Sequence, residues 1–487
     1  MPITPKSSCK NVLLILTDQQ RFDALGANGN SHIQTPNLDA FAKSAINFKQ
    51  HRISCPICTP SRASILTGQY ARTHGALQPG FTLNRSAETL AYWLAREGYA
   101  TGIFGKSHLE PECSEFNMAI DYELRDYYGF ATAQLSEDNL LGPYMKWLSR
   151  EHPQWVKAAW DQANEELQGS ATYGVDAKGR LRAAFATDLP PELSQSTWIT
   201  KQTEVFIQAQ TKAGQPFFSV CSYVPPHHPW TPPRSYMDRY NPASLPVPSR
   251  ELPDYGLATI LGIYNDGSTL SDEELQRLTA AYYALCTQLD DCIGQLLKTL
   301  EASGAADETI VIFSSDHGDH LGDRGMLRKS QALFDNILHV PLLIRMPGSA
   351  DRFGICHELT QNEDLAPTVL DLLGLAIPQS IQGSSFASVL RQTKDRPSSP
   401  LREHQFFEYP LTHQPYARVG VGDRRYKLIR CHPEPGWILI DREADLAEQR
   451  NLVGSREHSA AEQRLREALF DWLTSTGMCY GAKPYHW

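Results

Sequence analysis

Residues Asn11 to Leu16 read N-V-L-L-I-L, a continuous apolar run of strand length near the start of the 487-residue chain. An apolar run without alternation is typical of a parallel strand that is buried on both faces. A second run of this kind, T-I-V-I-F-S-S, spans Thr309 to Ser315. Segments with helical spacing alternate with such runs, and the longest covers Ser271 to Ala302. The sequence therefore predicts an α/β fold, with a mostly parallel sheet sandwiched by helices.

The pattern changes near Gln379 to Phe386, after which short strand-like segments alternate with turns. These segments are Glu408 to Leu411, Ala417 to Val421, Tyr426 to Arg430 and Trp437 to Ile440, and a helical segment from Glu457 to Thr474 closes the series. A meander of this kind packs against a helix. We therefore predict two domains, residues 1–385 and residues 386–487, of which the second is a smaller α+β unit of antiparallel strands and a helix.

Composition favours a soluble protein with an ample core, since 41% of residues are hydrophobic and the formal net charge is −10. The acidic balance argues against a nucleic-acid surface but allows a locally positive site for an anionic substrate. The first apolar run is too short for a signal peptide or a membrane span, so the cytoplasm is the expected location. Ten scattered cysteines suit free thiols in a reducing compartment. The aromatic tail, Tyr480 to Trp487, makes a homo-oligomer a candidate assembly.

Polar side chains follow the predicted strands at the points where ligands gather in open α/β sheets. They are Asp18 and Gln19, Lys106 and His108, His227, and Asp316 and His317. Taken singly, each is better explained as a turn, cap or solvated surface residue. Their shared position at strand ends is what makes them candidates for one site.

The segment Cys58 to Gly68 reads C-T-P-S-R-A-S-I-L-T-G. Pro60 fits the first turn of a helix, which puts Cys58 at the helix N-terminus, where free N–H groups and the dipole favour an anion. Arg62 lies one turn further on and adds a bidentate cationic donor. Cys55 and Cys58 also form a C-x-x-C pair, which elsewhere indicates a redox motif or half of a zinc site, but the sequence has no second such pair.

The pattern C-x-P-S-R followed by T-G resembles the signature of the type I sulfatases, in the alkaline phosphatase superfamily. The segments G-K-x-H-L, P-H-x-P and S-D-H-G with L-G-D resemble further motifs of that family, spread over most of the chain. The resemblance implies an alkaline phosphatase-like fold. It also implies that a separate formylglycine-generating enzyme oxidises Cys58 to formylglycine, whose hydrated aldehyde attacks sulfur.

The resemblance assigns roles residue by residue. One divalent cation, calcium first and manganese second, is expected on Asp18, Gln19, Cys58, Asp316 and His317. Many family members carry an acid where this chain has Gln19. The implied catalytic set is Cys58 with Arg62 at the sulfate oxygens, Lys106 and His108 near sulfate and formylglycine, and His227 or Lys329 as proton donor to the leaving group. His108 is the implied base when the sulfated intermediate collapses.

The implied function is hydrolysis of a sulfate monoester, carried by a glycan, an aryl group or another small molecule. A phosphonate monoester or phosphodiester hydrolase on the same scaffold shares the D-Q start and the D-H-G segment, and it stays open as an alternative. A non-catalytic protein that binds anions or glycans is a further alternative, which predicts an unmodified Cys58 and no bound metal.

Overall fold

We analysed a computed structural model of the chain, which describes residues 9–111, 126–167, 184–253, 267–330, 332–348, 353–391, 401–409, 418–432 and 436–476. The aromatic tail, on which the expectation of a homo-oligomer rests, lies outside the described residues.

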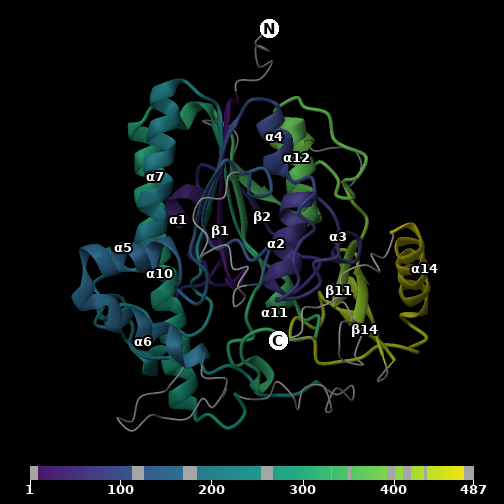
Figure 1. The fold of residues 1–487 in the computed structure, drawn as a ribbon. Helices are drawn as coiled ribbons and strands as arrows, with labels where there is room; N and C mark the ends of the chain where they lie inside the picture. The colour runs from purple at the N-terminus through teal and green to yellow at the C-terminus, as the bar shows by residue number, and fades with distance from the viewer. Residues whose placement is uncertain are drawn as a thin grey trace.

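The centre of the molecule is an eight-stranded sheet (Figure 1). Its spatial order is β5 (Thr132–Leu135), β4 (Ala100–Gly105), β6 (Phe217–Ser222), β1 (Asn11–Thr17), β7 (Thr309–Ser315), β8 (Leu342–Arg345), β2 (Ile46–Phe48) and β9 (Gly354–Cys356). Only β8 runs antiparallel to its neighbours among these described strands. The predicted α/β fold with a mostly parallel sheet is confirmed.

Helices cover both faces of the sheet because successive apolar residues of β1 point to opposite sides. Leu13 and Ile15 belong to one core cluster, and Val12, Leu14 and Leu16 belong to another. The first face carries α1 (Pro36–Ala42), α5 (Pro143–Glu151), α7 (Gln195–Ala213) and α10 (Asp272–Ala302). The second carries α2 (Cys58–Thr67), α4 (Leu90–Arg96), α12 (Leu365–Leu372) and α13 (Ala387–Arg391). Shorter helices are α3 (Ala71–His74), α8 (Arg234–Met237) and α11 (Asp335–Leu338), and α6 (Val156–Leu167) follows α5.

Helix α7 is the main element that the sequence did not predict. The sequence from Pro111 to about Gln210 carries no family motif and predicts an insertion over the active-site mouth. Within this region, however, α7 packs along α10 and against β4 and β6. Polar residues such as Thr200 and Thr203 occupy part of its buried face, which weakens the apolar periodicity. The helical pattern from Ser86 to Glu97 predicts Ser86 as an N-cap. Helix α4 instead begins at Leu90, with Thr89 as its N-cap.

The chain brings four strand ends to one level. Thr17 pairs with Ser315, and Leu16 pairs with Ser222, which in turn pairs with Gly105. Because parallel strands in register end at the same edge, the residues that follow must meet there. Those residues include three predicted site residues, Asp18, Lys106 and Asp316.

Gly105 allows the sharp exit of β4. Its φ is +95°, and a Cβ at this position would lie 1.9 Å from the carbonyl oxygen of Ser222. Only glycine tolerates both the left-handed backbone and that approach. The chain can therefore turn at Gly105 and deliver Lys106 to the centre of the edge.

A separate four-stranded antiparallel sheet follows, in the order β11 (Gln405–Tyr409), β12 (Arg418–Gly422), β13 (Tyr426–Cys431) and β14 (Trp437–Asp441). One face packs against α14 (Ser459–Ser475) through Leu465, Leu469 and Trp472. The other face packs against α11 and the chain before it. The predicted antiparallel unit with a closing helix is present, and the domain boundary at residue 385 stays a prediction. A small pair, β3 (His51–Arg52) and β10 (Thr360–Gln361), lies apart from both sheets.

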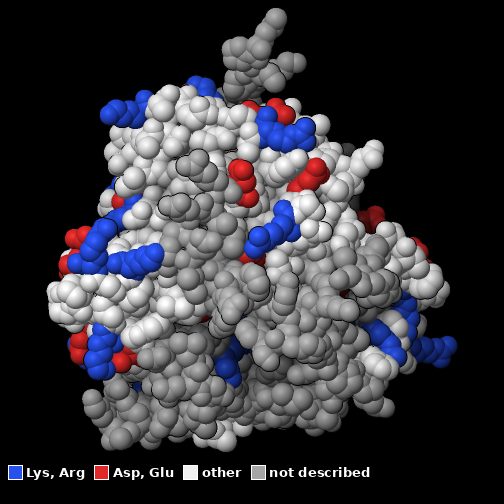
Figure 2. All heavy atoms as spheres, viewed as in Figure 1, with Lys and Arg blue, Asp and Glu red and all other residues white. Residues whose placement is uncertain are grey.

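On the face shown in Figure 2, the described basic and acidic side chains are interspersed and form no broad field of one sign. Within the described ranges, no helix has both the length and the apolar character required to cross a membrane.

Helix α10 offers a direct test of the fold. The Ser271 side chain caps Glu274 N, and the Glu274 carboxylate accepts from Ser271 N in a capping box. Ser271→Ala is expected to lower the free energy of unfolding by about 1 kcal/mol, since the backbone N–H of Glu274 loses its hydrogen-bond acceptor. Urea unfolding would measure this against Glu273→Ala, which changes an exposed residue of the same turn. Equal midpoints for Ser271→Ala and wild type would contradict the prediction.

Candidate active site at the carboxyl edge of the sheet

Asp18, Cys58, Asp316 and His317 form a fully buried cluster at the edge where β1 and β7 end. Each residue offers one ligand atom, and these atoms all lie within 4.8 Å of one another. His317 Nε2 lies 3.3 Å from Cys58 Sγ and 3.5 Å from Asp18 Oδ1. Four of the five predicted metal-binding residues are thus within reach of one ion.

Cys58 is the first residue of α2, as the sequence predicted. The helix is buried along its whole length, and Ser61 fixes its start by donating from Oγ to Asp316 O at 2.5 Å. Asn362, which the sequence analysis missed, donates to Ser61 O and accepts from Ser54 N. The nucleophile candidate is therefore held between two distant segments of the chain.

His317 presents a lone pair to the cluster. Its Nδ1 lies 2.8 Å from Gly318 O, and since a carbonyl only accepts, Nδ1 carries the proton. Burial lowers the pKa of His317, which keeps the ring neutral. Nε2 is consequently free to act as a metal ligand, in the tautomer that the backbone contact selects.

Two buried oxygens test whether a cation fits. Asp18 Oδ1 and Gln19 Oε1 have no hydrogen-bond partner among the residues that the structure describes. Buried polar atoms in proteins are otherwise almost always paired. Carboxylate and amide oxygens are the ligands that calcium takes, and the imidazole also suits manganese. The donor set therefore fits a divalent cation, and Gln19 joins the other four residues as a candidate ligand.

Arg62 contacts the two carboxylates, whereas the sequence analysis placed it at the substrate oxygens. Its Nε donates to Asp316 Oδ2 at 2.6 Å, and its Nη2 lies 3.4 Å from Asp18 Oδ2. The remaining nitrogen donates to Lys106 O and Ser222 Oγ. The side chain is 2% exposed, so it faces protein on all sides. Arg62 thus orients the carboxylates and balances their charge.

Lys106 bridges two acids. Its Nζ lies 2.8 Å from Asp18 Oδ2 and 2.5 Å from Asp138 Oδ1. Burial raises the pKa of Asp18, but the charges of Lys106 and Arg62 outweigh burial and hold that pKa well below its usual range. Asp138 was missed because its region gave no family motif, although an acid just beyond a strand, here β5, is a usable signal.

Lys329 contacts both the Cys58 sulfur and His227. Lys329 Nζ lies 2.8 Å from Cys58 Sγ, 3.2 Å from His227 Nε2 and 3.4 Å from His317 Nε2. His227 Nδ1 contacts His228 O at 2.6 Å, so its Nε2 is the acceptor. Burial lowers the pKa of His227, while the neighbouring Cys58 and Asp18 raise that of Lys329 against its burial. Lys329 is therefore the group that carries the proton here.

His108 lies close to the same charges but not on an extended segment. In an extended segment, alternation would put Lys106 and His108 on one face, which is what the sequence predicts. The φ of His108 is +54°, so that prediction is wrong. The Glu137 carboxylate holds this turn by accepting from Ser107 N and His108 N. Burial and the charge of Lys106 lower the pKa of His108, which favours the neutral ring.

A pocket of about 70 Å³ is lined by His227, which contacts Lys329, and by Asp138, which contacts Lys106. Asp138 and His228 lie in its wall together with Ser196 and Gln288 from α7 and α10. Lys329 is partly exposed, whereas Cys58 is fully buried.

These features define a class: an α/β protein with an alkaline phosphatase-like sheet and a candidate site for a divalent cation at the carboxyl edge of that sheet. Comparison with known proteins gives the family. The family described as Sulfatase matches residues 10–375, and the family described as N-sulphoglucosamine sulphohydrolase, C-terminal, matches residues 322–474. The chain belongs to the sulfatase family, and it is a sulfuric ester hydrolase.

Individual relatives cover almost the whole chain. An ulvan-active sulfatase of Formosa agariphila is 30% identical over 98% of this chain and 83% of its own length. An arylsulfatase of Clostridium perfringens is 28% identical over 95% of this chain and 94% of its own. Among solved structures, the phosphonate monoester hydrolase of Silicibacter pomeroyi superimposes with a TM-score of 0.81 at 27% identity, covering 98% of this chain and 99% of that one.

Proposed function

We propose that the protein cleaves sulfate monoesters with a formylglycine that a separate maturation enzyme makes from Cys58. The observation that carries this proposal is the position of the Cys58 sulfur, within reach of Asp18, Asp316 and His317 and 2.8 Å from Lys329 Nζ. The sulfur stands in for the hydroxyl oxygens of the hydrated aldehyde. Burial raises the pKa of the unmodified thiol to about 12, which makes it a poor nucleophile itself.

The surrounding side chains supply the other requirements of ester cleavage. A bound calcium ion, with manganese as second choice, would neutralise charge on the non-bridging oxygens and lower the pKa of a coordinated hydroxyl. Arg62 pairs with the Asp316 carboxylate and Lys106 pairs with that of Asp18, which fixes the positions of both. Lys329, with His227 as its hydrogen-bond acceptor, holds a proton where a leaving oxygen would sit. His108 is the proposed base for the collapse of the sulfated intermediate.

We place the leaving group in the pocket beside His227, and we propose a sulfated saccharide or aryl sulfate as its source. Hydrolysis of phosphonate monoesters is the second candidate. The high structural similarity to the Silicibacter pomeroyi enzyme supports it, as does Gln19 in the place of a second acid. Parallel assays on matched aryl sulfate and aryl phosphonate monoesters would rank the two activities.

Peptide mass spectrometry on the segment that contains Cys58 tests the nucleophile. We expect the mass of the aldehyde in protein produced together with a formylglycine-generating enzyme, and turnover that scales with the modified fraction. A fully retained thiol in protein that turns over aryl sulfate at the same rate would contradict the proposal.

Removal of the metal is expected to abolish turnover and to destabilise the fold. A ligand present at a thousand times its Kd stabilises a protein by about 4 kcal/mol, so chelation should lower the melting temperature clearly. Calorimetry and an aryl sulfate assay, repeated with added calcium and with added manganese, would identify the ion that restores both. An unchanged melting temperature and rate after exhaustive chelation would exclude the metal site.

The cytoplasmic location, a homo-oligomeric state and the absence of nucleic-acid and membrane partners stay predictions from the sequence.

A further inference from the structure

Gln19 occupies the place of a second acid, and the structure fixes its amide in one orientation. The side-chain Nε2 lies 2.5 Å from Asp319 Oδ2 and 3.5 Å from His228 Nδ1. An amide oxygen at that position would face a carboxylate oxygen and be repelled, so the nitrogen must point to Asp319. Oε1 therefore points the other way, and it is the buried oxygen that has no hydrogen-bond partner in the described part of the chain.

The backbone of Gln19 is strained and held on both sides. Its φ is +69°, a conformation that residues other than glycine seldom adopt. Gln19 N donates to Asp316 Oδ1 at 3.1 Å, and Tyr282 Oη donates to Gln19 O at 2.7 Å. Such strain persists only where the surroundings determine it, and it gathers at functional sites.

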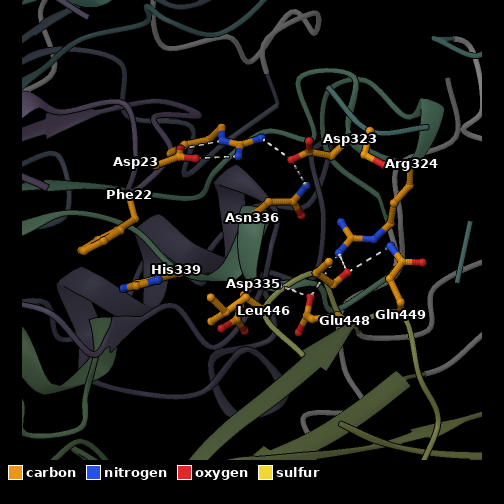
Figure 3. A pocket seen from close by; sticks show the side chains of 13 residues that line it. Phe22, Asp23, Asp323, Arg324, Asp335, Asn336, His339, Leu446, Glu448 and Gln449 are labelled. Carbon is orange, nitrogen blue, oxygen red and sulfur yellow. Dashed lines mark hydrogen bonds and ion pairs between the residues drawn. The ribbon is translucent and has the colours of Figure 1, made fainter. Parts of the chain in front are cut away.

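Asp319 is itself fully buried and rigidly placed. Its Oδ1 accepts from Leu321 N at 2.6 Å, which leaves Oδ2 for Gln19. Arg21 supports the same turn from the opposite side, donating to Asp319 O and His320 O. Arg21 also pairs with Asp23 and Asp323, which line a separate pocket of about 260 Å³ (Figure 3).

We propose that Asp319 is a positioning residue for the metal site, which holds the Gln19 amide so that Oε1 serves as a neutral ligand. This inference rests on the metal-binding part of the proposed function. In this arrangement Gln19 is a neutral ligand, and the negative charge lies on the Asp319 carboxylate, which accepts from the Gln19 amide and polarises it. Hydrogen-bond partners of metal ligands orient those ligands and raise their donor strength.

Asp319→Asn is the direct test. It removes the carboxylate oxygen that accepts from the Gln19 amide, and it keeps an oxygen that can accept from Leu321 N. The new amide oxygen can still accept from Leu321 N, so the turn is retained. Its NH₂ group, however, would face the NH₂ of Gln19, and two donors cannot bond. The Gln19 amide must then rotate and withdraw Oε1. We expect the calcium affinity of metal-free protein, measured by titration calorimetry, to fall about 10- to 100-fold.

The paired variant Gln19→Glu/Asp319→Asn provides the rescue. In the pair, the carboxylate at position 19 accepts from the amide at position 319, so the metal ligand is oriented again. The negative charge then lies on the ligand itself. We expect the affinity of the pair to recover toward that of wild type, whereas Gln19→Glu alone places two carboxylates against each other and weakens binding. Asp23→Asn, which alters an exposed carboxylate on Arg21, is the matched control and should bind calcium as wild type does.

The outcomes separate this inference from the proposed function. Wild-type affinity in Asp319→Asn, or a pair that binds no better than Asp319→Asn, overturns the role of Asp319 while the sulfatase proposal stands. Should Asp319→Asn fail to fold, Asp319→Ala in the same calorimetric titration replaces it, and unchanged affinity there overturns the inference equally. A wild-type protein that binds neither calcium nor manganese overturns the metal site and this inference together. A Cys58 that stays a thiol in active protein contradicts only the proposal that formylglycine is the nucleophile.

Discussion

The Cys58→Ala protein is expected to lose hydrolysis of aryl sulfate by between about 10⁴- and 10⁶-fold in kcat, the range seen when an enzyme loses its nucleophile. No other side chain in the described cluster is expected to take its place, because the proposed function uses Asp18, Asp316 and His317 as ligands of the metal ion. Cys58→Ser should lose nearly as much, since a serine there lacks the aldehyde. The measurement is steady-state turnover of purified, metal-loaded protein.

Cys55→Ala is the matched control for that experiment. Cys55 lies three residues upstream and is equally buried, but it packs in a small apolar cluster with Ile57 and Ala71. The control is expected to lose some stability and to keep its rate, which also tests the C-x-x-C interpretation. Wild-type kcat in Cys58→Ala, or equal losses in both cysteine variants, would show that Cys58 is not the nucleophile.

Arg62→Met is expected to cost about 3–5 kcal/mol of stability, because it leaves two buried carboxylates without their shared cation. The same substitution should remove most of the turnover, since Asp18 and Asp316 would no longer be held at the spacing that an ion requires. Urea unfolding reports the first effect, and kcat on aryl sulfate reports the second.

Arg72→Met separates the two effects. Arg72 forms another buried ion pair, with Glu408, whose carboxylate also accepts from Arg72 N. Its loss should destabilise the protein comparably and leave kcat nearly unchanged in the folded fraction. An Arg62→Met protein that is destabilised but turns over as fast as Arg72→Met would reduce Arg62 to a purely structural residue.

Local sequence was enough to predict the strands that carry the site. β1 and β7 are apolar without alternation, and the acids Asp18 and Asp316 follow them directly. Local sequence did not predict α7, because buried threonines and a glutamine interrupt the apolar periodicity of that helix. Packing against α10 is what buries this polar face. Local sequence also failed at His108, where a left-handed backbone ends the extended run.

The amino-acid sequence by itself determined which chemical groups stand at strand ends, and it determined that a cysteine opens a helix beside an arginine. Only the tertiary structure decided what those groups face. Arg62 meets Asp316 across 254 residues of chain, and Gln19 meets Asp319 across 300. Such contacts depend on the register between neighbouring strands, which brings four strand ends to one level. Because spacing along the chain does not encode that register, the supporting roles of Asp319 and Asn362 are seen only in the folded protein.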